Sequence, residues 1–194
     1  MSRVPPLAAP RLPVLPGLLC ALGVGCGPSG SHLKLIAFQD PHFPEHYDVR
    51  PDECVYRSDG AGDYHIVGRA SSRPRADAPA VEQIFHLHVF WRPRPGKTYD
   101  HPSLVDAVVR YAITSRQGSA VYRGAGYAYP SPSRWSDELT VKLESATVTL
   151  AAQRGDAPEL LGQAHVLGTL IARNDPSRAV ELMREIERLD TGTP

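Results

Sequence analysis

The sequence predicts a mainly β fold, an antiparallel β-sandwich or open barrel completed by one C-terminal α-helix. Segments rich in β-branched and aromatic residues, separated by Gly- and Pro-containing turns, recur from residue 33 to residue 172. Residues 176–189 repeat apolar side chains at helical spacing. A chain of this length is the size of one domain. We therefore expect a single domain over residues 33–194, with about seven to nine strands.

The first segment, residues 1–26, has the pattern of a secretory signal peptide. Arg3 and Arg11 are its only charged side chains, an apolar run covers residues 12–25, and small residues precede Cys26. The run is shorter than the about 20 apolar residues that a membrane-spanning helix needs. We expect it to be cleaved rather than kept as a span.

The end of this segment, Leu22-Gly23-Val24-Gly25-Cys26, resembles the signal peptides of bacterial lipoproteins. In that family the cysteine is lipidated and becomes the mature N-terminus; here Leu22 stands one position further upstream than in the family's motif. The resemblance implies export, a lipid on Cys26 and attachment to a membrane outside the cytoplasm. Residues 27–32 then form a short tether rich in Gly, Pro and Ser.

The first strand is expected at residues 33–38, followed by a loop over residues 39–52 that contains Pro41, Pro44 and Pro51. Residues 54–57 and 64–71 are expected to form a hairpin, because the glycines between them suit a tight turn.

Residues 81–91 alternate in a way that leaves apolar side chains on both faces, which predicts a central strand. Residues 104–115 fit either a strand or a helix. We favour the strand, since β-branched residues dominate and a Gly-containing turn leads into residues 120–129.

Residues 120–129 carry a face of small side chains that would let another layer approach closely. The apolar alternation of residues 139–143 changes phase in residues 146–150, which predicts a β-bulge or a tight turn near Glu144. The last strand is expected at residues 163–172. Asp175 as a cap and Pro176 at the first position then predict the start of a helix over residues 176–189.

The charge balance argues against a nucleic-acid partner. The chain has 21 Lys and Arg against 21 Asp and Glu, and loss of Arg3 and Arg11 leaves 19 against 21. Of the three cysteines, Cys20 leaves with the signal and Cys26 is the anchor, so Cys54 remains alone. If an ordinary signal peptidase cuts instead, Cys26 and Cys54 could pair.

Three histidines form the candidate metal site. His86 and His88 lie two apart on a strand and so project from one face, as imidazole ligands of metal-binding strands do. A third ligand is required, and His65 on the preceding hairpin could approach them. The alternative is that these histidines belong to a half-buried face.

Tyr99 and Trp135 form the candidate glycan platform, because both are expected in loops where flat rings can stack on sugars. A Gly-x-Ser-x-Gly nucleophile motif and a phosphate-binding glycine loop are both absent from the sequence.

We therefore expect an exported, lipid-anchored envelope protein that acts as a non-catalytic interaction or structural module without a cofactor. The alternatives are a metal-dependent enzyme that uses His86 and His88, and a glycan-binding β-sandwich. The ligand, the protein or glycan partner, the oligomeric state and the membrane that holds the anchor are left open by the sequence.

Overall fold

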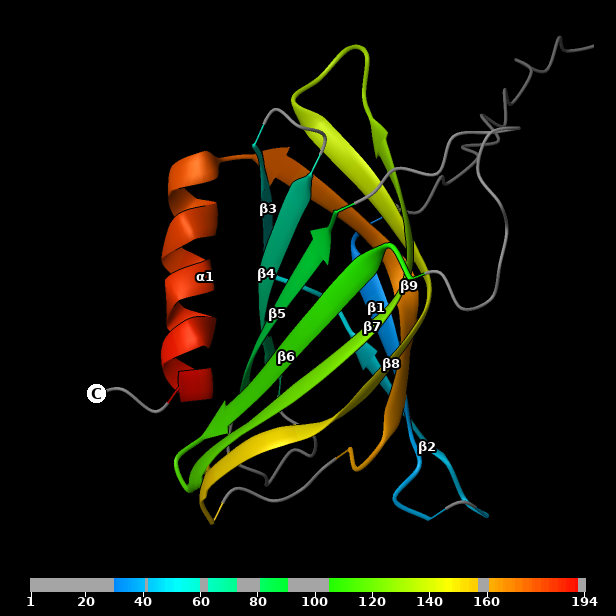
Figure 1. Cartoon of the computed structure of the whole chain (residues 1–194), viewed down its shortest axis with the longest axis vertical. Helices are drawn as coiled ribbons and strands as arrows, with labels where there is room; N and C mark the ends of the chain where they lie inside the picture. The colour runs from blue at the N-terminus through cyan, green and yellow to red at the C-terminus, as the bar shows by residue number, and fades with distance from the viewer. Residues whose placement is uncertain are drawn as a thin grey trace, which may run out of the picture.

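A computed structural model describes residues 30–40, 42–59, 63–72, 81–90, 105–156 and 161–191. These residues form one sheet with the strand order β2-β1-β9-β3-β4-β5-β6-β7-β8, and one helix beside it (Figure 1). The bounds of the elements are β1 His32–Ala37, β2 Glu45–Val49, β3 Glu53–Ser58, β4 Tyr64–Ser72, β5 Val81–Val89, β6 Ala107–Ser115, β7 Gly118–Pro132, β8 Glu138–Gly155, β9 Ala164–Asn174 and α1 Pro176–Thr191. The predicted mainly β fold with one C-terminal helix is confirmed.

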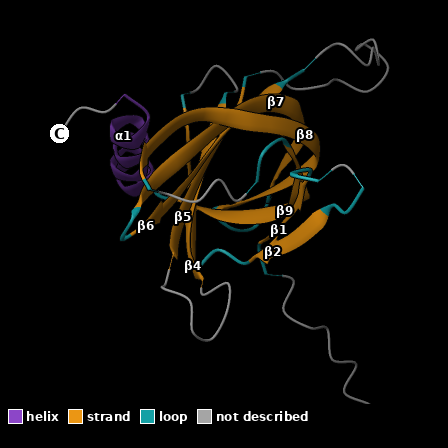
Figure 2. Ribbon diagram, turned by 90° about the horizontal axis from the view of Figure 1, so that it is seen from below, coloured by secondary structure: helices purple, strands orange, loops and turns teal. Residues whose placement is uncertain are grey.

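Strand β9 closes the sheet on itself. Along one edge it pairs with β8, from Glu138 opposite Arg173 to Val148 opposite Ala164. Its other edge pairs first with β1 and then, at Arg173 and Asn174, with β3. The strands therefore enclose a barrel, and Figure 2 shows them curving around a common interior with α1 outside. The β3–β9 pairing is parallel, and the other pairings among the described strands are antiparallel.

Strands β3 to β7 bury side chains on both of their faces. The inner face contributes to the barrel core, whose largest fully buried side chains include Tyr111, Tyr122 and Leu87. The outer face packs against α1 in a second cluster. Its members are Val55, Val67, Ile84, Ala112, Val121, Ala179, Leu182 and Ile186. This two-sided burial explains why β5 is apolar on both faces, and it confirms the prediction that β5 is a central strand.

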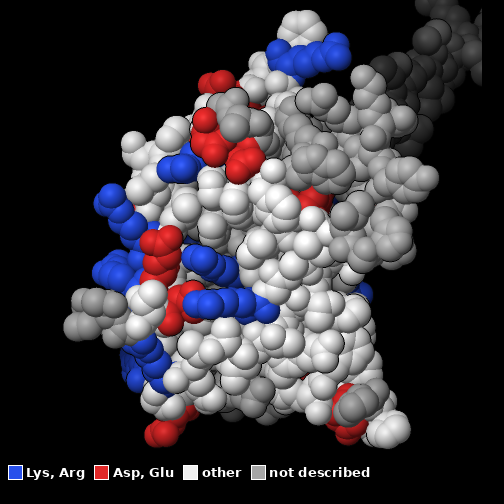
Figure 3. Space-filling model, in the orientation of Figure 1, with Lys and Arg blue, Asp and Glu red and all other residues white. Residues whose placement is uncertain are grey.

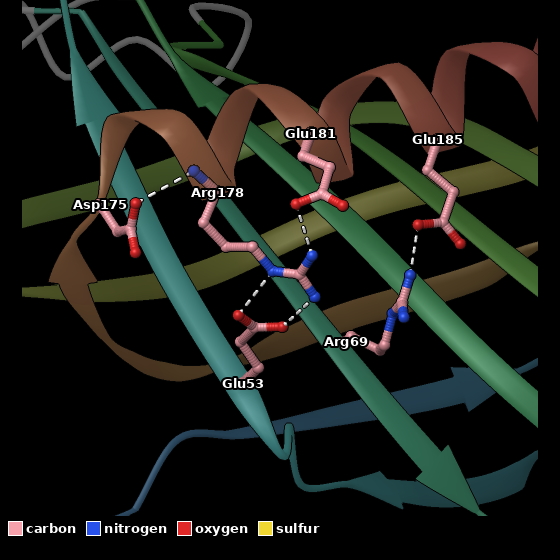
Figure 4. A network of polar contacts seen from close by, with 6 residues as sticks. All are labelled: Glu53, Arg69, Asp175, Arg178, Glu181 and Glu185. Carbon is pink, nitrogen blue, oxygen red and sulfur yellow. Dashed lines mark hydrogen bonds and ion pairs between the residues drawn. The ribbon is translucent and has the colours of Figure 1, made fainter.

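Helix α1 begins where the sequence predicts. The backbone N–H of Arg178 donates to Asp175 Oδ1 at 3.0 Å, which is an N-terminal cap, and Pro176 occupies the first helical position. Beyond the cap, Arg178 donates to both carboxylate oxygens of Glu53 on β3, each at 2.8 Å. Glu185 accepts a hydrogen bond from Arg69 on β4 (Figure 4). These ion pairs fix the helix across strands β3 and β4.

The loop predicted over residues 39–52 is wrong in part, because Glu45–Val49 forms β2 and pairs antiparallel with β1. This edge strand is short and mostly exposed, and only Val49 is fully buried. Pro44 and Pro51 lie just outside it and do not interrupt its hydrogen bonds. Prolines flanking a polar edge strand look like loop punctuation in a sequence.

The ambiguous segment before residue 115 is a strand, β6, as predicted. The phase change near Glu144 is also confirmed as a bulge within the continuous strand β8. Tyr127 pairs with Ser145 and the next residue, Ala128, pairs with Leu143, so Glu144 is the additional residue.

The small face of β7 makes room for the neighbouring strand rather than for another layer. A Cβ atom on Gly124 would lie 1.8 Å from the carbonyl oxygen of Thr147 on β8. One on Gly126 would lie 2.0 Å from the carbonyl oxygen of Ser145. The two glycines therefore permit a close approach of β7 and β8 beside the bulge.

Candidate functional site

The structure brings His65, His86 and His88 together on the outer face of the barrel wall. In the pairing of β4 with β5, His65 stands directly opposite His88, while His86 lies one step further along the same face. Nδ1 of His65 lies 3.1 Å from Nε2 of His86, so one ring donates a hydrogen bond to the other. The rings of His65 and His88 stack with their centroids 4.2 Å apart.

Charged residues of both signs surround this histidine cluster, which we define as His65, His86 and His88. Arg57 of β3 stands opposite His65, and Arg110 of β6 stands opposite His86. Asp63 Oδ2 lies 3.3 Å from Nε2 of His88 at the outer edge of the cluster. The carboxylate therefore lies near the half-buried ring of His88, and the two guanidinium groups flank His65 and the buried His86.

Burial keeps His65 and His86 neutral. The pKa of His86 is lowered to about 3, first by burial and then by the neighbouring His65 and Arg110. The pKa of His65 is lowered to about 4, first by burial and then by His88 and Arg57. At neutral pH both rings are uncharged, which leaves them able to accept hydrogen bonds or to act as metal ligands.

The arrangement of the rings bears on the metal hypothesis. The facing nitrogens of His65 and His86 have a separation that two ligands of one tetrahedral zinc ion could adopt, given Zn–N bonds of about 2.0–2.1 Å. The ring of His88, however, stacks on His65, and its Nε2 lies beside Asp63. Among the described residues, no group of three or more His, Cys, Asp and Glu side chains is arranged to hold a metal ion.

The two members of the predicted aromatic platform differ in placement. Trp135 lies in the turn between β7 and β8 and is 96% exposed. The hydroxyl oxygen of Ser133 accepts hydrogen bonds from the backbone N–H groups of Trp135 and Ser136, which fixes this turn. Tyr99 lies outside the described residues.

An open groove beside α1 was not predicted from the sequence. It has a volume of about 730 Å³ and lies between the helix and strands β6 and β7. Its charged lining consists of Arg110, Arg123, Glu181, Arg184, Glu187, Arg188 and Asp190. Figure 3 shows side chains of both signs gathered on the side of the molecule that carries α1. The sequence shows the polar face of the helix, but it does not show which strands that face would lie beside.

Cys54, the cysteine expected to remain alone, lies on β3 and forms no disulfide with any described residue, and Cys26 is not among these residues. The pKa of this thiol is raised to about 12, mainly by burial and in smaller part by the nearby Glu53. The thiol therefore stays protonated at neutral pH, which is the opposite of an activated nucleophile.

The predicted signal segment, with Cys26, lies outside the described residues. No described helix is both long enough and apolar enough to cross a membrane.

Comparison with known proteins gives no match, because no protein-family model, curated protein or solved structure matches the chain. Export and lipidation therefore remain predictions from the sequence.

Proposed function

We propose that this chain is an exported protein held on a membrane by a lipid on Cys26, where it acts as a non-catalytic interaction or structural module of the cell envelope. Residues 1–26 support export, and the lipoprotein-like end of that segment supports the anchor. The near-neutral charge supports a partner other than nucleic acid.

The start of the folded domain is the observation that carries the proposal. The Ser31 hydroxyl donates to the carbonyl oxygen of Ile171 at 3.0 Å and accepts from the backbone N–H of the same residue at 2.8 Å. Strand β1 follows at once, from His32. The barrel is thus secured five residues after Cys26. A tether of that length would hold the domain directly against the membrane surface.

The construction of the wall suits a module that presents a fixed surface. The barrel core occupies one face of β3 to β7, while α1 covers part of the other face through a separate apolar cluster. Ion pairs from Arg178 to Glu53 and from Arg69 to Glu185 hold the helix in register with the strands. Surface residues on α1 and on the adjoining strands therefore keep constant relative positions.

Replacement of Cys26 tests the proposed anchor. We expect the full chain, expressed in a bacterium with its own leader, to partition into the detergent phase of a Triton X-114 extract. The mature N-terminus should then be an acylated Cys26 in an intact-mass measurement. Cys26→Ser should move the protein out of that phase, whereas Cys54→Ala should leave the partition unchanged. A Cys26→Ser protein that partitions like the unaltered chain would remove the proposal.

The metal-dependent enzyme is the second candidate, because the structure brings His65, His86 and His88 together. Elemental analysis of the purified protein and of His86→Ala tests it directly. Stoichiometric zinc, copper or nickel that His86→Ala loses would favour this function over a non-catalytic module. A protein that contains no stoichiometric metal after preparation in metal-supplemented medium would reject the metal-dependent enzyme.

A further inference from the structure

We propose that the tip of the β7–β8 hairpin, residues 133–137, docks on the bilayer that holds the lipid anchor and that Trp135 inserts its ring into the headgroup region. This inference rests on the proposed anchor at Cys26 and adds the orientation of the barrel on the membrane. Its basis is the position of the hairpin relative to the first described residues, together with the exposure and chemistry of its tip.

The chain enters the barrel on the same side as the hairpin tip. Strand β1 runs antiparallel to β9, from His32 opposite Thr169 to Ala37 opposite Ala164. The residues before His32 therefore lead toward the end of β9, and Ser31 is already bonded to Ile171. On the other edge of β9, β8 begins at Glu138 opposite Arg173. The hairpin tip precedes Glu138, so it lies beyond the same end.

The reach of the tether matches the reach of the hairpin. Thr140 stands opposite Ile171, and Trp135 lies five residues before Thr140, at most about 17 Å further along the strand direction. The five residue steps from Ser31 back to Cys26 span at most about 18 Å. A lipid on Cys26 and the ring of Trp135 can therefore reach one bilayer surface at the same time.

The tip itself is built to hold an apolar ring in solvent. Trp135 is 96% exposed, although the backbone around it is fixed by Ser133 and by the hydrogen bond from Ser133 N–H to the Glu138 carbonyl oxygen at 2.9 Å. The base of the hairpin is tied to β9, because Asn174 N–H donates to the carbonyl oxygen of Asp137. Figure 1 shows this hairpin projecting past the other strands at one end of the barrel.

The chemistry of the tip fits the membrane interface. Tryptophan favours the headgroup region, where its ring contacts apolar chains and its indole N–H finds polar partners. Arg134 and Arg173 near the tip are balanced by Asp137 and Glu138. Attraction to anionic lipid is therefore not the driving force, and we expect docking to be insensitive to salt. Because the lipid makes the contact intramolecular, a weak local affinity is enough.

Tryptophan fluorescence of the lipidated full chain in vesicles tests the inference. The chain has two tryptophans, so Trp91→Phe leaves Trp135 as the sole reporter. In zwitterionic phosphatidylcholine vesicles we expect the emission of Trp135 to shift to the blue and to be quenched by brominated lipids, equally at low and at high salt. Slowed amide hydrogen exchange of residues 133–137 on vesicles, measured without substitution at Trp91, provides a second readout.

The outcomes separate this inference from the anchor itself. A chain that floats with vesicles through Cys26 but keeps a solvent-exposed, unquenched Trp135 would overturn docking and leave the anchor intact. A chain without lipid on Cys26 would remove both proposals. A shift of Trp135 emission on addition of soluble polysaccharide, with no effect of vesicles, would assign the ring to glycan and also overturn docking.

Discussion

At the scale of single residues, the histidine cluster has the clearest physical consequence. His86 is only 6% exposed, and a proton on its ring would place a positive charge beside Arg57 and Arg110. A proton on its nearest ring neighbour, His65, would place a charge beside Arg57. The spacing of His86 and His88 could be read from the sequence, because alternate residues of a strand share a face. The position of His65 opposite His88 depends on the β4–β5 register, and the depth of His86 depends on the wall around it, which the sequence does not show.

Acid should destabilise the protein through this cluster. The folded-state pKa of His86, about 3, lies below the ordinary value of 6.5, so below pH 6.5 the unfolded chain binds a proton that the folded chain does not. The free energy of unfolding should therefore fall as pH decreases from 6.5 toward 4, by up to about 1.4 kcal/mol per pH unit from His86. Urea unfolding at a series of pH values measures this slope.

His86→Gln should flatten that slope by removing the proton-binding group. His46→Gln is the matched control, because His46 is exposed on the edge strand β2. The control should keep the slope of the unaltered protein. Equal slopes for His86→Gln and the unaltered protein would show that His86 is not the source of the acid sensitivity.

A second prediction concerns Gly124. Alanine there would bring Cβ to 1.8 Å from the carbonyl oxygen of Thr147, so the backbones of β7 and β8 must separate. We expect Gly124→Ala to lower the free energy of unfolding by about 1–3 kcal/mol in urea denaturation. Ala125→Ser, at the next and partly exposed position, should change it by less than about 0.5 kcal/mol. Similar effects of the two substitutions would show that β7 and β8 can separate at Thr147 without a loss in the free energy of unfolding.

At the scale of elements, the sequence predicts what local patterns determine. The cap at Asp175, the strand β6 and the bulge near Glu144 all follow from residues that are adjacent in the chain. Strand β2 was missed because its residues are polar and edge strands do not need a continuous apolar face. The groove beside α1 was missed for a different reason, since it depends on which strands the helix covers.

The bidentate pair between Arg178 and Glu53 gives a prediction at this scale. Hydrogen bonding by Arg178 lowers the pKa of Glu53, which shows that the pair favours the ionised carboxylate. Both side chains are partly exposed, so we expect Arg178→Ala to cost about 1 kcal/mol in thermal or urea unfolding. Arg184→Ala is the matched control on the same helix, because Arg184 forms no ion pair among the described residues. A loss of equal size for Arg184→Ala would mean that helix propensity, and not the pair, accounts for the effect.

At the scale of the whole molecule, closure of the barrel is what the sequence could not supply. Val55 pairs with Arg173, and His32 pairs with Thr169, across more than a hundred residues of chain in each case. Alternation within a strand identifies its buried face but not its neighbours, so a sandwich and a barrel give the same pattern. The second apolar face of β3 to β7 could be read from β5, yet its occupant, α1, is known only from the fold.

The last prediction follows from the burial of β3 to β7 on both of their faces. Leu182 is fully buried between α1 and the outer face of the wall, in the cluster that includes Val67 and Ile84. Leu182→Ala should therefore lower the stability of the barrel as well as that of the helix, by about 2–5 kcal/mol. Far-ultraviolet circular dichroism should report the loss of helix, and hydrogen exchange of β5 amides should report the loss of the wall. The circular dichroism signal and the protection of the β5 amides should decrease together, because α1 and the outer face of the strands share one apolar cluster and small domains unfold cooperatively.

Val180→Ala, at a partly exposed position of the same helix, is the control and should lower the free energy of unfolding by less. Unchanged protection of β5 in Leu182→Ala would show instead that the barrel is stable without the helix and that α1 is an independent cover on it.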